Sequence, residues 1–292
     1  MTARPPTLDP VAADRLARRA PAPSPWLHEE VGRRMAERLE WIRLQPEDWV
    51  DWRPVQGGLE AHALVSARYP KAPCTVVEPD PAQAKFAAAR LQPPWWRRWS
   101  RAPVSVLPQA PAGQARMLWA NMALHAAAEP QALIARWHQA LAVDGFLMFS
   151  SLGPDSLREL RQLYADLGWP PAGPDFTDMH DWGDMLVEAG FAEPVMDMER
   201  ITLTWTSPEA LLAELRTLGT NLHPARFPAC RGRAWRERLL GALRERLTGE
   251  DGRLALGIEI VYGHALRPLA RPRVAAESAF SLQDMRQLLR GQ

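Results

Sequence analysis

Two acidic residues stand at the expected ends of β-strands, where a carboxylate can accept hydrogen bonds from a nucleotide. Asp51 closes the first expected strand and Glu78 closes the second. Ligands of a doubly wound sheet bind at the carboxyl ends of the strands, where the strand order reverses. Glu78 is therefore placed to accept both ribose hydroxyls of an adenosine, and Gly57 and Gly58 mark the turn between the two strands. Together these residues predict a nucleotide-type cofactor site.

The loop after the first strand, WRPVQGG (52–58), has glycine only at its last two positions. Glycine lets a backbone approach a ligand without a Cβ clash, and Pro54 removes an amide donor from the loop. The chain has no G-x-G-x-x-G motif, which argues against a dinucleotide site. A Gly-Gly pair is also ordinary turn chemistry, so both interpretations of Gly57 and Gly58 stay open.

Three polar residues follow the third and fourth expected strands. Gln109 is positioned to bond an adenine amino group, although any loop glutamine has that capacity. Asn121 is a candidate to hold a substrate oxygen, and His125 a candidate to line the mouth of the pocket. Ordinary loop capping explains Asn121 and His125 equally well.

Arginines of a basic helical stretch are candidates to bind a substrate carboxylate, because a guanidinium forms paired hydrogen bonds with that group. They are Arg231, Arg233 and Arg236. An exposed helix face, or a patch that attracts an acidic protein, explains them as well. His180, Asp181 and Asp184 suggest metal ligation only superficially. The start of a helix explains them better, and no metal is expected.

The composition narrows the class of protein. The chain has 292 residues and a net charge of +1, so no field draws it to nucleic acid or to an anionic membrane. Cys74 and Cys230 cannot form a disulfide framework, which indicates a reducing compartment. We see no apolar stretch long enough for a signal peptide or a membrane span and expect a cytoplasmic protein.

Strands alternate with helices along the first half of the chain, which predicts an α/β fold with a doubly wound, mostly parallel sheet and helices on both faces. Beyond residue 153 the pattern changes to helices around two long strands, predicting a helical insertion and a C-terminal antiparallel strand pair. Seven strands are expected in all. They span 49–52, 74–78, 104–107, 116–121, 146–153, 194–206 and 254–266.

We divide the chain into a flexible N-terminal arm (1–25), a nucleotide-binding half (26–153), a substrate half of the same domain (154–267) and a loose tail (268–292). The helix predicted over 26–44 covers one face of the sheet. An Arg/Trp-rich insert at 93–103 is either a surface loop that covers the sheet edge or a contact for a partner.

The combination of segments resembles the class I S-adenosylmethionine (SAM) methyltransferases, and within them the malonyl-[acyl-carrier-protein] O-methyltransferases of biotin synthesis. The first segment is LQPEDWVDW…ARYPKAPCTVVEPDP (44–81). The resemblance continues through MLWANMALHAAAEPQALIARWHQALAVDGFLMFSSLGPDSLRELR (117–161) and MHDWGDMLVEAGFAEPVMDMERITLTWTSPEALLAELRTLG (179–219), and ends with GRLALGIEIVYGHA (252–265).

The resemblance implies methyl transfer from SAM to the free carboxylate of a malonyl thioester, carried by acyl carrier protein or coenzyme A. No general base is needed, because a carboxylate is already a nucleophile. The chain departs from the family at Arg116, where an aspartate is usual, and in the tyrosine-free segment 16–31. A non-catalytic relative that binds or scaffolds a protein partner therefore stays open. So does a relative that modifies a protein, since the chain also resembles mitochondrial assembly factors of respiratory complex I.

Overall fold

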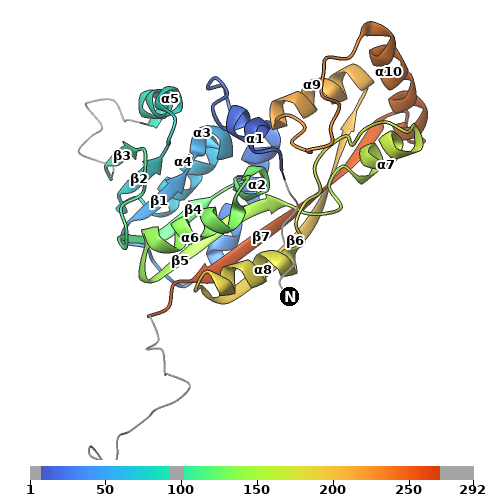
Figure 1. Cartoon of the computed structure of the whole chain (residues 1–292). Helices are drawn as coiled ribbons and strands as arrows, with labels where there is room; N and C mark the ends of the chain where they lie inside the picture. Colours follow the sequence, from blue (N-terminus) through green and yellow to red (C-terminus); the bar gives the residue numbers. More distant parts are fainter. Residues whose placement is uncertain (1–7, 92–101, 270–292) are drawn as a thin grey trace, which may run out of the picture.

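The centre of the computed structural model, which describes residues 8–91 and 102–269, is a seven-stranded sheet (Figure 1). Its strand order is β3-β2-β1-β4-β5-β7-β6. β1 to β5 are parallel neighbours, and β7 runs antiparallel to both β5 and β6. The strands are β1 (Trp49–Trp52), β2 (Cys74–Val77), β3 (Val104–Leu107), β4 (Ala115–Ala120), β5 (Leu141–Leu152), β6 (Ala192–Trp205) and β7 (Leu254–Leu266).

Burial explains which segments became central strands. All four residues of β1 are buried, and so are the last eight of β5, from Gly145 to Leu152. Near-continuous apolar runs are typical of parallel strands that are covered on both faces. β6 lies at the sheet edge, and most of its first half is exposed or half-buried. The expected doubly wound sheet with a C-terminal antiparallel pair is confirmed.

Helices cover both faces of the sheet. Apolar residues of α2 (Trp26–Arg38), α4 (Leu59–Arg68) and α5 (Pro81–Leu91) pack in one core cluster. Trp137 of α6 (Pro130–Ala140) and Trp182 of α8 (Met179–Glu188) belong to the cluster on the opposite face.

Further helices gather beyond the carboxyl ends of the parallel strands, beside the long β6–β7 pair (Figure 1). They are α7 (Arg158–Asp166), α9 (Pro208–Leu218) and α10 (Arg233–Leu247). Leu211 of α9 and Leu243 of α10 are fully buried in the same core cluster as α2. These helices therefore form a wall at the edge where a parallel sheet binds its ligands. Three short turns complete the described elements: η1 (Leu39–Trp41), α3 (Pro54–Gly57) and η3 (Leu124–Ala126).

Residues 8–25 differ from the flexible arm that the sequence predicts. They contain helix α1 (Pro10–Ala17), whose N-terminus is capped by Asp9 through hydrogen bonds from Val11 and Ala12. Leu8 and Ala12 pack against Leu222, and Asp9 pairs with Arg226 at 2.6 Å. Only Ala12 and Ala13 of α1 are buried, so its contact with the distant segment around residue 222 helps to hold it in place.

Two sequence predictions fall outside the described residues. Most of the Arg/Trp insert (93–103) and almost all of the C-terminal tail (268–292) belong to the undescribed ranges 92–101 and 270–292. Within residues 8–91 and 102–269, none of the helices combines the length and the apolar character that crossing a membrane requires.

Candidate functional site

A crevice lies between the carboxyl ends of β1 and β4, where the strand order of the sheet reverses. Its volume is about 320 Å³. Trp52 and Arg53 border it from β1, Asn121 borders it from β4, and α1 covers it. The reversal of strand order is where doubly wound sheets bind nucleotides, so this crevice is the candidate cofactor site.

Glu78 follows β2 and is almost completely buried, next to Pro79, which borders the crevice. Its Oε1 accepts a hydrogen bond from the Val55 amide at 3.0 Å, but its Oε2 is buried with no partner among the described residues. Burial raises the pKa of Glu78 to about 7, against the opposing effects of the Val55 amide and the Arg53 guanidinium. A buried acceptor without a donor is unfavourable. Because a ribose diol offers two O–H donors, Glu78 fits the adenosyl group that the sequence resemblance implies.

Arg53 occupies a loop position whose backbone conformation favours glycine. Its backbone is left-handed, with φ 58° and ψ 53°, a conformation that strains residues other than glycine. Its Nη2 donates to the Ala17 carbonyl at 2.7 Å, and burial lowers the pKa of its guanidinium. Val55 turns into the core and is 2% exposed. Arg53 therefore borders the crevice beneath α1, and Val55 does not fill it.

Residues 16–19, called the strap below, are held down by three side chains. Besides Arg53, the Gln56 amide donates to the Leu16 carbonyl at 3.3 Å, and the Gln83 amide donates to the Arg19 carbonyl at 2.7 Å. The last carbonyls of a helix have no partners within the helix. Side chains of the loop 52–58, called the cofactor loop below, and of α5 therefore donate hydrogen bonds to the carbonyls at the end of α1.

Gly57 and Gly58 have packing reasons of their own. A Cβ on Gly57 would lie 2.8 Å from the Asn121 carbonyl oxygen, and one on Gly58, with φ 134°, would lie 2.7 Å from Glu29 Oε2. Glu29 accepts hydrogen bonds from the Leu59 and Ala61 amides and so caps α4. The glycine pair thus lets α2 and β4 approach the loop closely. Gly57 also borders the crevice.

Asp51 and Gln109 do not reach the crevice. Asp51 is buried on the core side of β1, where its Oδ2 lies 2.7 Å from His62 Nδ1 on α4. Burial raises the pKa of Asp51, and the hydrogen bond from His62 opposes that effect. Gln109 is exposed after β3 and borders none of the cavities described here.

The side chain of Asn121 is fully engaged within the protein. Its amide nitrogen donates to the His28 carbonyl at 2.7 Å and to the Gly57 carbonyl. Its Oδ1 accepts a hydrogen bond from the Ser150 hydroxyl at 2.6 Å. Asn121 therefore ties α2 and the cofactor loop to β5, and it borders the crevice without a free polar atom for a ligand.

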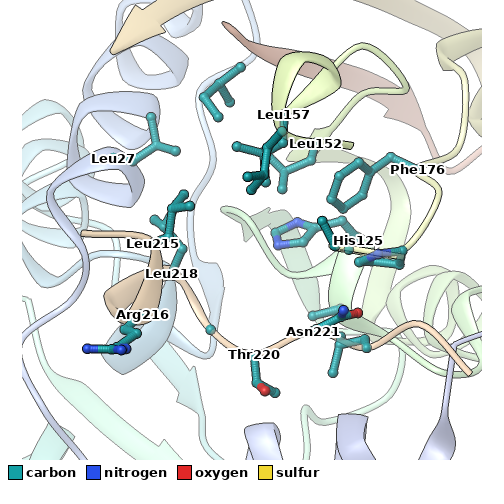
Figure 2. A pocket seen from close by; sticks show the side chains of 18 of the residues that line it. Leu27, His125, Leu152, Leu157, Phe176, Leu215, Arg216, Leu218, Thr220 and Asn221 are labelled. Atoms are coloured by element: carbon teal, nitrogen blue, oxygen red, sulfur yellow. The ribbon is translucent and has the colours of Figure 1, made fainter. Parts of the chain in front are cut away.

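A second, apolar cavity of about 330 Å³ opens beside the crevice, beneath α7 and α9 (Figure 2). Figure 2 shows His125 and Phe176 on one side of it and Leu27, Leu215 and Leu218 on the other. A third cavity, of about 300 Å³, joins the two regions, since it shares Leu16, Met122 and Ala126 with both of them. The site is thus a polar crevice that leads into an apolar pocket.

Two histidines stand where these spaces meet, because His28 and His125 border both the apolar pocket and the joining cavity. Their rings are 6.3 Å apart and nearly perpendicular. His28 Nδ1 lies 2.7 Å from the Gln56 carbonyl oxygen. Burial lowers the pKa of His28, and burial together with His28 lowers the pKa of His125 to about 3. Both rings are therefore neutral at physiological pH.

The three candidate arginines lie outside the lining of the apolar pocket. Arg231 stacks over Phe227 at 4.0 Å and over Trp235 at 4.4 Å. Arg233 pairs with Glu237 at 2.9 Å on the exposed face of α10, and Arg236 is exposed beside it. Arg231 is also 5.9 Å from Trp169, whose ring contacts the pocket residue Tyr164. We call these three residues the arginine rim; Arg231 connects it to the wall of the pocket through Trp169 and Tyr164.

Over residues 8–91 and 102–269, no group of three or more His, Cys, Asp or Glu side chains is arranged to hold a metal ion. His180 and Asp181 lie in the first turn of α8, as a helix start predicts. Asp178 caps this helix by accepting a hydrogen bond from the His180 amide at 2.8 Å.

Sequence reasoning missed His28, the strap and the pocket wall formed by residues 212–222. His28 does carry a signal, since it lies three and seven residues before Val31 and Met35 and so shares their buried helix face. No local pattern indicates the strap, because its partners lie 36 to 64 residues away along the chain.

The strand order, the reversed final strand and the crevice at the switch point define a class I, Rossmann-like methyltransferase fold. Two solved structures share it. One is a Bacillus halodurans protein assigned as a methyltransferase (TM-score 0.53, 15% identity, covering 80% of this chain and 99% of that one). The other is the YcgJ protein of Bacillus subtilis (TM-score 0.52, 11% identity, covering 81% and 98%). No protein-family profile matches the chain.

Curated sequences define the family more closely. The chain is 41% identical over 256 residues to the malonyl-[acyl-carrier protein] O-methyltransferase of Laribacter hongkongensis, covering 85% of this chain and 84% of that protein. The enzyme of the same name from Gallionella capsiferriformans is 38% identical, covering 87% of each chain. That of Halorhodospira halophila is 34% identical, covering 82% and 80%. The chain belongs to the malonyl-[acyl-carrier protein] O-methyltransferase family, which confirms the resemblance seen in the sequence.

Proposed function

We propose that this protein transfers a methyl group from SAM to the free carboxylate of a malonyl thioester carried by acyl carrier protein, as a cytoplasmic step of biotin synthesis. The main support is Glu78, a buried acceptor without a donor among the described residues, which stands next to Pro79 of the switch-point crevice. This crevice leads into an apolar pocket. The names of the similar proteins support the malonyl substrate and its carrier. Nothing in the described structure favours a non-catalytic role over this one.

Glu78 is the residue that would hold the ribose of SAM, which supplies a methyl group bound to a positively charged sulfur. The crevice beneath α1 offers the adjoining space. The leucines and Phe176 of the apolar pocket orient the acyl chain and exclude water from the carboxylate. Orientation and water exclusion account for most of the acceleration that this chemistry needs. A general base is not required, because no proton leaves the carboxylate.

The arginine rim is the proposed docking surface for the carrier. Arg231 is linked to the pocket wall through Trp169 and Tyr164, and Arg233 is exposed on α10. The rim would thus face an acidic protein whose acyl arm enters the cavity. This role replaces direct binding of the substrate carboxylate by Arg231, Arg233 or Arg236. Malonyl-coenzyme A has no carrier protein to contact the arginine rim, so its acyl group would bind in the pocket without that contact.

The test is a transfer assay with methyl-labelled SAM and malonyl-carrier protein, malonyl-coenzyme A or acetyl-coenzyme A. We expect label in both malonyl thioesters, none in the acetyl thioester, and a loss of at least 100-fold in Glu78→Ala. Folded wild-type protein that labels neither malonyl thioester would overturn the proposal.

A further inference from the structure

The apolar pocket has few polar groups that can reach a substrate carboxylate. Arg216 borders it, but its side chain points away from the cavity (Figure 2). Asn221 is engaged, because its amide donates to the Pro171 carbonyl and its oxygen accepts from the His223 amide. Tyr164 and Thr220 bring hydroxyls to the pocket but do not border the joining cavity, whereas His28 and His125 border both spaces. A carboxylate placed between the crevice and the pocket would meet these imidazoles.

The surroundings of His125 fix which of its nitrogens carries the proton. Nδ1 is buried and has no hydrogen-bond partner in the described part of the chain. A buried N–H without an acceptor costs more free energy than a buried lone pair without a donor. The tautomer with the proton on Nε2 and the lone pair on Nδ1 is therefore the favoured one for His125. The ring borders both cavities, and its accessible part carries Nε2.

His28 has the complementary arrangement. Its Nδ1 lies 2.7 Å from a carbonyl oxygen, which can only accept, so this nitrogen carries the proton and Nε2 keeps its lone pair. His28 therefore offers no donor to a carboxylate. Of the two imidazoles, only His125 has an N–H that is not already used within the described part of the chain.

We propose that His125 binds the acceptor carboxylate through its Nε2–H, as a neutral donor in place of an arginine. This inference rests on the proposed function and names the group that holds the reacting substrate. His125 binds the oxygen that does not react and leaves the other oxygen facing the crevice.

A neutral donor suits this chemistry better than a cation does. The carboxylate loses its negative charge as it takes up the methyl group, so a charged partner would stabilise the substrate more than the transition state. Only interactions that are stronger in the transition state accelerate the reaction. A single neutral hydrogen bond in an apolar pocket orients the anion while leaving it reactive.

The test compares the binding of malonyl-coenzyme A and butyryl-coenzyme A, which lacks the carboxylate, by titration calorimetry. In His125→Phe we expect malonyl-coenzyme A to bind 10- to 100-fold more weakly, as loss of a hydrogen bond to a charged group predicts, and butyryl-coenzyme A to be unaffected. His125→Gln keeps an N–H donor and should stay within about threefold of the wild type. His138→Phe is the matched control, since His138 packs against Phe191 on the other face of the sheet.

Equal weakening for both thioesters in His125→Phe would show a packing role and overturn the inference. So would unchanged malonyl binding. Both results leave the proposed function intact if wild-type protein still methylates malonyl thioesters. A wild-type protein that binds malonyl-coenzyme A no better than butyryl-coenzyme A would overturn the inference and the proposed function together.

Discussion

Single residues of the site differ in whether their hydrogen-bonding capacity is already used. Asn121 and Glu29 are satisfied within the protein, whereas Glu78 Oε2 and His125 Nδ1 are buried and have no partner within residues 8–91 and 102–269. Buried polar atoms without partners are rare in folded proteins and often mark functional positions. Glu78 is next to Pro79 of the crevice and His125 borders the pocket, so the proposed function and the further inference both start from them.

Glu78 should make the stability of the ligand-free protein depend on pH. The folded protein binds this proton more tightly than the unfolded chain does, since the pKa rises from 4.5 to about 7. Its favourable contribution is therefore complete below pH 4.5 and is lost as the pH rises to about 7. Relative to Glu78→Gln, the wild type should lose about 3 kcal/mol of unfolding free energy across this window. Urea unfolding of both proteins at several pH values measures the difference, and a constant difference would contradict the account.

Asp51 should matter for stability and not for cofactor binding. Asp51→Ala leaves His62 buried without its partner and should cost about 3 kcal/mol of unfolding free energy, while Asp51→Asn, which keeps an acceptor, should cost about 1 kcal/mol. Urea unfolding gives both values. SAM affinity should be unchanged in Asp51→Asn, and a tenfold loss there would place Asp51 in the cofactor site after all.

At the scale of elements, α1 is held by contacts distant in sequence. The strap joins the end of α1 to the cofactor loop through Arg53 and Gln56, to α5 through Gln83, and to α9 through Arg19, which donates to the Arg216 carbonyl. α1 covers the crevice, so a ligand of the crevice must enter while these hydrogen bonds open or rearrange.

Arg53→Gly tests how α1 is held. It removes the donor to the Ala17 carbonyl and relieves the left-handed backbone, so we expect little change in overall stability but more frequent opening of the strap. Tryptic cleavage after Arg18 and Arg19 should become about fivefold faster, as the loss of one hydrogen bond predicts. Arg90→Ala, on the exposed face of α5, is the control. Equal cleavage rates in Arg53→Gly and the wild type would show that Arg53 does not hold α1.

The sheet was predictable from sequence because its strands are short apolar runs separated by turn residues. β2 (CTVV) and the apolar part of β5 show this pattern, and Glu78 stands at the predicted strand end. The partners of side chains were not predictable. Nothing local shows that Asp51 bonds to His62 of α4 while Glu78 bonds to the Val55 amide of the loop after β1. The direction of each side chain depends on elements that meet only in the folded chain.

At the scale of the whole molecule, the two halves of the chain supply different parts of one site. The ends of the parallel strands and α1 provide the crevice, whereas α7, α9 and the segment after α9 form one wall of the apolar pocket and Leu27, His28 and His125 of the first half form another. The arginine rim lies outside that pocket, at the N-terminal end of α10 (Figure 1). In the proposed function, this arrangement would separate recognition of the carrier from recognition of the acyl group.

Charge reversal at the rim should therefore affect one substrate and not the other. In Arg233→Glu/Arg236→Glu we expect KM for malonyl-carrier protein to rise about tenfold, because both side chains are exposed where the carrier would dock. KM for malonyl-coenzyme A should be unchanged. Arg90→Glu, on the distant helix α5, is the matched control. A similar rise for both substrates would contradict a docking role and favour direct contact with the acyl group.

The position of the transferred methyl group tests the central claim most directly. SAM labelled with ¹³C in its methyl group, incubated with the protein and malonyl-carrier protein, gives a product whose carbon chemical shift identifies the bond formed. The account predicts a single methyl ester resonance, present in the wild type and absent in Glu78→Ala. A product whose labelled methyl group is bonded to carbon, nitrogen or sulfur would contradict it. So would the absence of any labelled product besides SAM itself from folded protein with both substrates present.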